Sequence, residues 1–133
     1  MLTIRRMAVT ALLVGSTWAP HAAPEPGQGV RRSDLQKHDL SIHGREVIQV
    51  RVDLAPGAAF GRHRHPGEEL VYVIEGSLQY EVEGRAPVTL RAGEVLFIPA
   101  GTIHAARNVG RGNGAELATY VVEKGKPLIT LVR

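Results

Sequence analysis

The sequence predicts an all-β domain, either a sandwich or a small barrel. Three observations favour this fold class: 5% of the residues are aromatic, 15 glycines and 8 prolines interrupt the 133-residue chain, and the branched apolar residues fall in short runs. Such runs, separated by turn residues, are typical of β-strands rather than of helices. The chain is long enough for one compact domain and a short tail.

The beginning of the chain has the layout of an export signal. Arg5 and Arg6 precede an apolar run at 7–14, and small residues follow. The run is too short to span a membrane, and a first helix of the domain is the alternative interpretation. We predict three segments: a cleavable signal peptide at 1–22, a flexible linker rich in proline and glycine at 23–32, and the β-domain at 33–133. The mature protein is expected in the periplasm or secreted, without stable membrane insertion.

The charge of the chain does not favour a nucleic-acid partner. The formal net charge is +3, but Arg5 and Arg6 belong to the predicted signal, and the rest of the chain has 14 basic and 13 acidic residues. These charges are interspersed and form no basic patch. The chain has no cysteine, so it forms no disulfide, and any site for a soft metal would depend on imidazole ligands.

The first half of the domain contains one strand that is well defined by its pattern. Residues 45–54 alternate between apolar and polar side chains, which predicts a strand with one buried face. The segment 33–43 contains at most a short strand, and its histidines, His38 and His43, are interpreted as surface residues. Residues 70–74 are apolar at every position, so we expect one face of this strand to line the barrel and the other to meet a second subunit. This run predicts a homodimer.

Five more short strands are expected in the second half of the chain. Each is an apolar or alternating run that ends at a glycine, a proline or a polar turn. They are expected at 77–83, 88–90, 95–98, 116–122 and 127–132. About eight strands at this spacing fit a sandwich or a small barrel.

Two histidines in the stretch 57–76 form half of a candidate metal site. His63 and His65 stand two positions apart. Residues i and i+2 of a strand point to the same face, so the two imidazoles can reach one metal ion. Arg62 and Arg64 alternate with them and should point away from that ion.

The other half of the candidate site is a carboxylate and a third imidazole. Glu69 follows the turn after His65, and His104 lies downstream. Glu68 adjoins Glu69, but the spacing favours Glu69. Three imidazoles and one carboxylate suit borderline divalent ions and leave positions open for water, dioxygen or substrate. Fe(II) and Mn(II) are favoured because they prefer six ligands, and Zn, Ni or Cu also match this donor set.

Two motifs in this sequence resemble those of the cupin superfamily. The matching positions are Gly57, His63, His65, Glu69 and Gly76 in the first motif, and Gly93, Pro99, Gly101, His104 and Asn108 in the second. About 16 residues separate the motifs, as in compact bacterial members. The resemblance, closest to small single-domain, quercetinase-like cupins with a conserved barrel, implies a double-stranded β-helix, also called a jelly-roll barrel. Asn108 is interpreted as structural, because an asparagine side chain can hydrogen-bond a turn.

The resemblance implies chemistry but leaves its type open. It implies a metal-dependent dioxygenase that acts on a small enol or catechol-like compound, with Glu69 as ligand and catalytic proton acceptor. Because one barrel supports many activities, a non-catalytic small-molecule binding or sensing module and a redox-neutral lyase or isomerase remain alternatives. Five large side chains either line a pocket or belong to the core, with the core favoured for all except the first: Phe60, Tyr72, Tyr80, Phe97 and Ile103.

Overall fold

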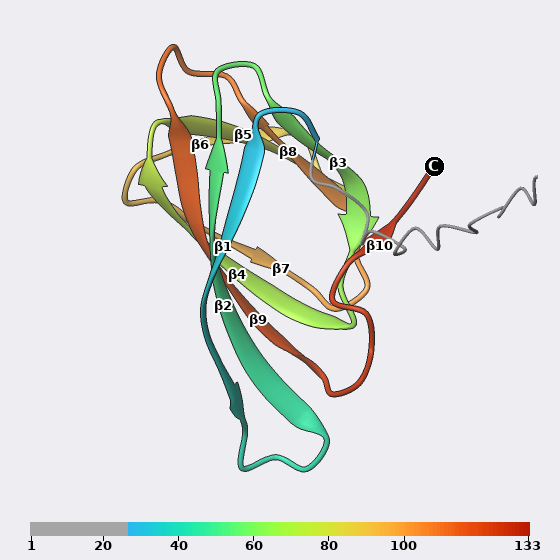
Figure 1. Cartoon of the computed structure of the whole chain (residues 1–133). Helices are drawn as coiled ribbons and strands as arrows, with labels where there is room; N and C mark the ends of the chain where they lie inside the picture. Colours follow the sequence, from blue (N-terminus) through green and yellow to red (C-terminus); the bar gives the residue numbers. More distant parts are fainter. Residues whose placement is uncertain (1–26) are drawn as a thin grey trace, which may run out of the picture.

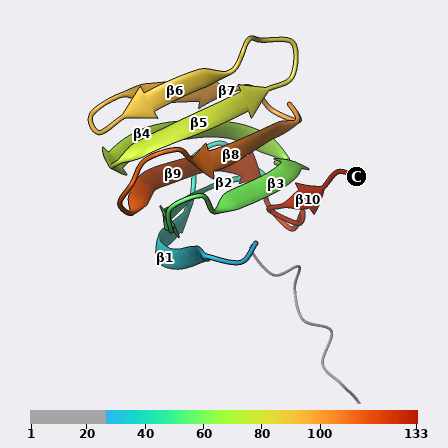
Figure 2. The same ribbon diagram turned by 90° about the horizontal axis from the view of Figure 1, so that it is seen from above.

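The computed structural model describes residues 27–133 as two five-stranded antiparallel sheets that face each other (Figures 1 and 2). The strand order is β1-β2-β9-β4-β7 in the first sheet and β10-β3-β8-β5-β6 in the second. The described residues contain no helix, and hence none that could cross a membrane. The strands are β1 (Val30–Asp39), β2 (Arg45–Leu54), β3 (Ala59–Arg64), β4 (Gly67–Glu75), β5 (Ser77–Val82), β6 (Val88–Arg91), β7 (Val95–Ile98), β8 (His104–Asn108), β9 (Gly114–Glu123) and β10 (Thr130–Leu131). The predicted all-β fold class is confirmed.

Strand β1 begins at Val30, within the segment predicted as a linker, and is longer than expected. It pairs with β2 from Val30 opposite Leu54 to Asp39 opposite Glu46, with one irregularity at Leu35. Backbone hydrogen bonds therefore hold this edge strand, although it has too few alternating apolar residues to be recognised from its side chains. The signal peptide predicted at 1–22 lies outside the described residues.

Most other predicted strands are found near their expected positions. The predicted bounds of β2 and β7 are confirmed to the residue. Strand β9 extends the prediction at both ends, whereas β10 retains only two residues of the predicted 127–132. The histidine-containing segments form β3 and β8, which lie side by side in the second sheet.

The hydrophobic core fills the space between the two sheets. Its residues alternate along each strand, because successive side chains point to opposite faces. The core includes Val50, Val52, Leu54, Val71, Val73, Leu78, Tyr80, Val82, Ala118, Tyr120 and Val122. The large number of inward-pointing β-branched residues explains how so few aromatic residues suffice to fill this interior.

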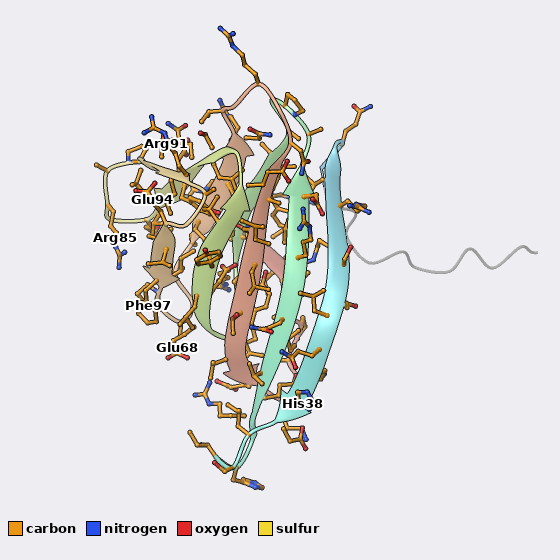
Figure 3. All side chains as sticks on the ribbon, turned by 90° about the vertical axis from the view of Figure 1, so that its left-hand side faces the viewer. His38, Glu68, Arg85, Arg91, Glu94 and Phe97 are labelled. Carbon is orange, nitrogen blue, oxygen red and sulfur yellow. The ribbon has the colours of Figure 1, made fainter. Side chains whose placement is uncertain are left out.

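The apolar run 70–74 has one buried and one exposed face. Val71 and Val73 belong to the core, as expected for the face that lines the barrel. Leu70, Tyr72 and Ile74 point outward and are 47%, 47% and 38% exposed. On the neighbouring strand β7, Phe97 lies opposite Leu70, projects from the same surface and is 51% exposed (Figure 3). The outer face of β4 and β7 is therefore an apolar surface.

A tight corner places β4 against β9. The chain passes from the second sheet to the first at Gly67, where a Cβ atom would overlap the backbone of Val121 and Val122. Only glycine permits this close approach of two backbones. The corner sets the direction of β4, and two residues later Glu69 points into the barrel.

Candidate metal centre

Two of the four candidate ligands face each other across neighbouring strands. His63 on β3 is paired directly with His104 on β8, and the centroids of their rings are 4.2 Å apart. A bulge between Phe60 and His63 brings both of these residues to the inner face, although they are three positions apart. His65 follows the end of β3, and its ring centroid is 4.8 Å from that of His63. The three imidazoles thus gather on the inner side of the second sheet.

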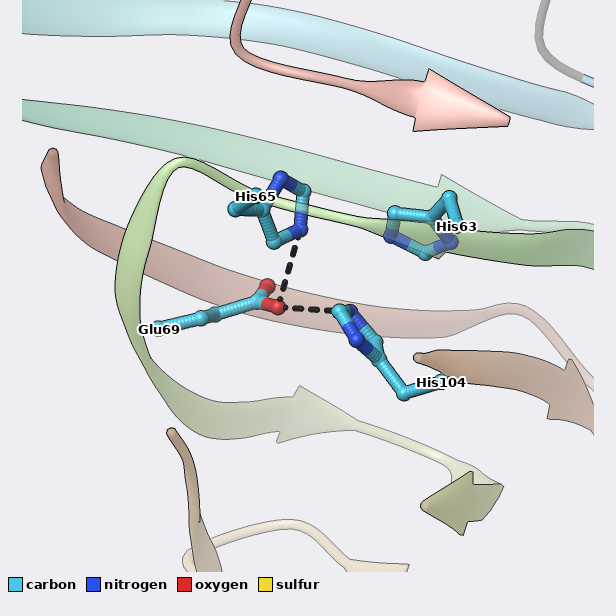
Figure 4. A group of neighbouring side chains, drawn as sticks. All are labelled: His63, His65, Glu69 and His104. Carbon is cyan, nitrogen blue, oxygen red and sulfur yellow. Dashed lines mark ion pairs between the residues drawn. The ribbon is translucent and has the colours of Figure 1, made fainter. Parts of the chain in front are cut away.

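The fourth candidate ligand comes from the opposite sheet. The Glu69 side chain extends from β4, and its Oε2 atom lies 3.2 Å from Nε2 of His65 and 2.9 Å from Nε2 of His104 (Figure 4). The four residues are buried, and one donor atom from each lies within 4.8 Å of the others. The structure therefore brings together His63, His65, Glu69 and His104, as the sequence predicted.

Backbone carbonyl groups orient the three imidazole rings. The Nδ1 atoms of His63, His65 and His104 lie 2.8, 2.6 and 2.9 Å from the carbonyl oxygens of Gly61, Leu128 and Thr102. A carbonyl oxygen can only accept a hydrogen bond, so Nδ1 carries the proton in each ring. In a neutral ring, Nε2 then keeps its lone pair, which is the arrangement that outer hydrogen bonds impose on metal-binding histidines.

The centre of the cluster has acceptors but lacks a donor. Nε2 of His65, Oε2 of Glu69 and Nε2 of His104 are buried and have no hydrogen-bond partner of suitable geometry among the described residues. Buried polar atoms without partners are costly, and lone pairs that face one another repel. A cation at this point satisfies all three atoms at once, and two nitrogens and one oxygen are donors that divalent transition metals accept. The residues present therefore fit a metal ion.

Burial and mutual contact prepare His63 and Glu69 to act as ligands, whereas His104 must give up a proton more readily held than usual before it can bind a metal. Burial lowers the pKa of His63 to about 3, with the nearby His104 adding to the effect, so this ring is neutral near pH 7. Burial alone would raise the pKa of Glu69, but the contacts with His104 and His65 outweigh it and hold the pKa at about 2. Burial opposes the charged form of His104 as well, yet the contact with Glu69 raises its pKa above the ordinary value.

Most residues near the cluster point in the directions predicted from the sequence. Glu68 is half-buried and points outward from β4, whereas Glu69 points inward. Arg62 and Arg64 are exposed, which confirms that they point away from the cluster. Asn108 is buried, donates hydrogen bonds to the carbonyls of Leu54 and Gly112, and accepts one from the amide of Gly110, which confirms its structural role.

A small cavity of about 20 Å³ adjoins the cluster inside the barrel. This volume has room for about one water molecule. The cavity is lined by Arg32, Val52, Leu54, Phe60, His63, Glu69, Tyr80, His104, Ala106, Glu116 and Tyr120. A larger surface hollow of about 240 Å³ lies elsewhere, and His104 is the only cluster residue in its wall.

The large side chains considered for a pocket fall into three groups. Phe60 and Tyr80 line the inner cavity. Ile103 lies in the wall of the surface hollow. The prediction that Tyr72 and Phe97 belong to the core is wrong, because both are exposed on the outer face of the first sheet. Alternation within β4 and β7 gives two faces of similar apolarity, so sequence alone did not identify the inner one.

Three further residues of the cavity were not anticipated from the sequence. Glu116 and Tyr120 lie on β9 in phase with buried residues, so a carboxylate on an otherwise apolar face was a usable signal for Glu116. Arg32 lies in a segment with the composition of a linker and carried no such signal. The Tyr80 hydroxyl donates a hydrogen bond to Oε2 of Glu116.

Glu116 is expected to make the metal-free protein less stable as the pH rises. Burial, together with the nearby charge of Glu69, raises the pKa of Glu116 to about 7, against an ordinary value of 4.5. The folded state therefore holds this proton more tightly than the unfolded state, so its stabilising effect is complete below pH 4.5 and is lost as the pH rises through 7. The loss amounts to about 3 kcal/mol. Denaturant unfolding of the wild type and of Glu116→Gln, below pH 4.5 and above pH 7, measures this loss of unfolding free energy.

The glutamine variant should lose less stability between these pH values than the wild type. All other titrating groups are shared, so the difference isolates residue 116. Glu83→Gln, at an exposed position, should retain the pH dependence of the wild type. Identical pH dependence of the wild type and Glu116→Gln would show that Glu116 ionises normally in the folded protein.

Comparison with known proteins agrees with the fold. A family model described as the cupin domain matches residues 50–123, more than half of the chain. The oxalate-binding protein of Thermotoga maritima is 30% identical over 83 residues, which cover 62% of this chain and 68% of that protein. Germin-like protein 1 of Brassica napus is 32% identical over 85 residues, which cover 60% of this chain and 41% of that protein.

Solved structures show the same architecture. A recombinant oxalate oxidase in complex with glycolate superposes with a TM-score of 0.63 at 27% identity, over 77% of this chain and 55% of that one. Among the relatives compared by sequence, the dimethylsulfoniopropionate lyase of Ruegeria pomeroyi is 33% identical over 60 residues, which cover 45% of this chain and 30% of the lyase. The chain thus spans about half or less of several relatives, and these relatives differ in the activities that their names describe.

Proposed function

This chain belongs to the cupin family, and from that premise we propose that it binds one divalent metal ion through His63, His65, Glu69 and His104 and uses the ion to act on a small molecule. The observation that carries the proposal is the convergence of Nε2 of His65, Nε2 of His104 and Oε2 of Glu69, which are buried without a hydrogen-bond donor. A cation at the centre stabilises such a group of acceptors: a metal ion can do so, and in the metal-free protein a proton on His104 can take its place.

The residues of the site have separable roles. The three imidazoles, each oriented by a backbone carbonyl, supply neutral donors, and Glu69 supplies a negative charge that offsets half of the charge of a divalent ion. Fe(II) or Mn(II) fits this set best, since four protein donors leave two of six positions open, and the bound ion supplies Lewis-acid or redox chemistry there. Glu69 also lines the inner cavity and is therefore close to a molecule bound there, but a pKa of about 2 makes it a weak proton acceptor.

We propose metal-dependent dioxygenase activity as the first candidate function. The open positions beside a carboxylate support it, and the oxalate oxidase among the similar structures supports oxygen-dependent chemistry in general. An aromatic enol or catechol, which the resemblance implied as substrate, does not fit a cavity of about 20 Å³ as it stands. The cavity favours a compound with few heavy atoms.

The second candidate is a protein that binds a small molecule without transforming it. One specific observation supports this alternative: the aligned region covers 68% of a relative that is named an oxalate-binding protein. The cavity as it stands holds about one water molecule, so a ligand of a few atoms requires the wall to move, and two reactants at once would require still more space. A redox-neutral lyase or isomerase is the remaining class.

Dioxygen uptake distinguishes these functions. Protein purified from its own compartment is first analysed for metal, and the metal-loaded protein is then mixed with small organic acids in an oxygen electrode. Uptake that depends on both metal and acid shows an oxygen-dependent enzyme, and incorporation of both atoms of labelled dioxygen into the product, without release of hydrogen peroxide, supports the dioxygenase. Anaerobic conversion of the acid indicates a lyase or isomerase, and recovery of the acid unchanged with a raised melting temperature indicates a binding protein. Wild-type protein without any bound metal would refute the proposal.

We further propose that the protein forms a homodimer through the outer face of β4 and β7. Exposed apolar side chains gather there around a groove of about 340 Å³. An exposed apolar surface of this kind is costly in water and is typical of an interface. A dimer with twofold symmetry would cover the surface of each copy with that of the other.

Export to the periplasm or the medium remains our proposal for localisation. It is supported by Arg5 and Arg6, the apolar run that follows them and the small residues after that run. Mass spectrometry of the protein recovered from the periplasm or the medium should find an N-terminus near residue 23. An intact N-terminus on protein found only in the cytoplasm would contradict it.

A further inference from the structure

We propose that Arg32 forms the entrance of the inner cavity and binds the carboxylate group of a small aliphatic acid there. This inference rests on the proposed metal function, since it names the class of molecule that the same site takes. It assigns a binding role to a residue outside the cluster of histidines and Glu69.

The pairing of β1 with β2 places Arg32 on the inner face of the first sheet. Arg32 lies directly opposite Val52, a core residue, and paired residues of neighbouring strands share a face. Its neighbour Arg31 lies opposite Asp53 on the other face and forms an ion pair with it at 3.2 Å. Arg32 therefore reaches the cavity that adjoins the cluster, and Arg31 does not.

Arg32 is the residue of the cavity wall whose side chain can most easily change conformation. All other lining residues are buried and belong to the packed interior, whereas Arg32 is half-buried. Its guanidinium group lies 6.0 Å from the ring centroid of Phe60 and 5.8 Å from that of Tyr120, and donates one hydrogen bond of 3.3 Å to the Tyr120 hydroxyl. A long side chain held by one weak hydrogen bond and two aromatic rings can move aside to admit a ligand.

The guanidinium group of Arg32 has N–H donors available for a ligand. Within the described part of the chain, Arg32 forms no ion pair, whereas Arg31 and Arg51 are both paired with Asp53. Glu116 lines the same cavity, but it already accepts the hydroxyl of Tyr80. A planar guanidinium matches a carboxylate with two parallel hydrogen bonds, which gives this residue type its preference for carboxylate ligands.

The charges around the cavity favour an anion once a metal is bound. The lining residues with formal charge are Arg32, Glu69 and Glu116, so the protein part carries a net charge of −1 when both carboxyl groups are ionised and of 0 when Glu116 is protonated. A divalent ion changes this to +1 or +2, and the carboxylate of a small acid lowers the positive charge by one in either case. A neutral molecule of the same shape would leave a buried positive charge without compensation.

Titration calorimetry on Mn(II)-loaded protein tests the proposal, with glycolate as the probe and glycolamide as its neutral counterpart. Wild type should bind glycolate at least about tenfold more tightly than glycolamide, because the amide lacks the charge-assisted hydrogen bonds. Arg32→Gln should weaken glycolate binding by about tenfold or more, and should leave the number of Mn(II) ions per chain unchanged. The glycolate affinity of Arg32→Lys should be intermediate, because lysine keeps the positive charge but cannot form two parallel hydrogen bonds to a carboxylate.

The matched control is Arg31→Gln, one residue away on the opposite face, which should bind glycolate as the wild type does. Metal stoichiometry is measured first and tests the proposed function separately; if no metal binds, the same glycolate titration is run on the metal-free variants. Equal glycolate affinity of the wild type and Arg32→Gln would overturn the role of Arg32, as would wild type that prefers glycolamide or binds neither probe. Thermal unfolding of each variant verifies that it is folded.

Discussion

Replacing His104 by alanine is expected to abolish metal binding and to leave the barrel folded. His104 supplies one of the four donors, and its Nε2 atom lies 2.9 Å from Oε2 of Glu69, so its loss opens the site on the side of β8. Loss of an outer hydrogen-bond partner alone weakens metal binding by about 10- to 100-fold, and loss of a ligand should cost at least about 100-fold. Metal analysis after dialysis should find about one ion per chain for the wild type and almost none for the variant.

The fold should survive because the hydrophobic core does not depend on His104. The core cluster of alternating residues from both sheets does not include the histidine, and circular dichroism should retain the β-sheet signal. His104→Gln keeps more of the side-chain volume and serves if the alanine variant is unstable. The control is His38→Ala, an exposed position on β1 (Figure 3), which should bind metal normally. Full stoichiometric binding by folded His104→Ala would refute the ligand assignment.

The second large effect is expected at the outer face of the first sheet, where Phe97→Asp should convert a dimer into a monomer. Phe97 is 51% exposed in the single chain and lies opposite Leu70 beside the apolar groove. A charged group at the centre of an apolar interface would be desolvated without a partner, and a change at such a position costs about 2 kcal/mol or more, about 30-fold in the dissociation constant. Sedimentation velocity at micromolar concentration measures the change.

The matching control for this surface is Ile42→Asp. Ile42 is also a large exposed apolar residue, but it lies in the turn between β1 and β2, away from the proposed interface. This variant should sediment as the wild type does. A wild-type protein that is monomeric at these concentrations would remove the proposed dimer, and an unchanged dimer of Phe97→Asp would move the interface elsewhere.

The sequence was sufficient for the candidate ligands because their identity is a local property. The spacing of His63 and His65 predicts a shared face, and the two motifs predicted that Glu69 and His104 would join them, which the structure places within 4.8 Å. The strand at 95–98 was equally well defined, because its short apolar run is bounded by turn residues on both sides. The division of the ordered chain into strands was therefore largely predictable.

The sequence by itself identified the four candidate ligands: the i and i+2 spacing related His63 to His65, and the resemblance of two motifs to those of the cupin superfamily added Glu69 and His104. The tertiary structure alone decided what surrounds them. Arg32 reaches the cavity because β1 pairs with β2 in a register that sets it opposite Val52, and Tyr72 and Phe97 face outward because of how β4 lies against β9. Alternation distinguishes two faces of a strand, but only the neighbouring strands and the opposite sheet determine which face is inside.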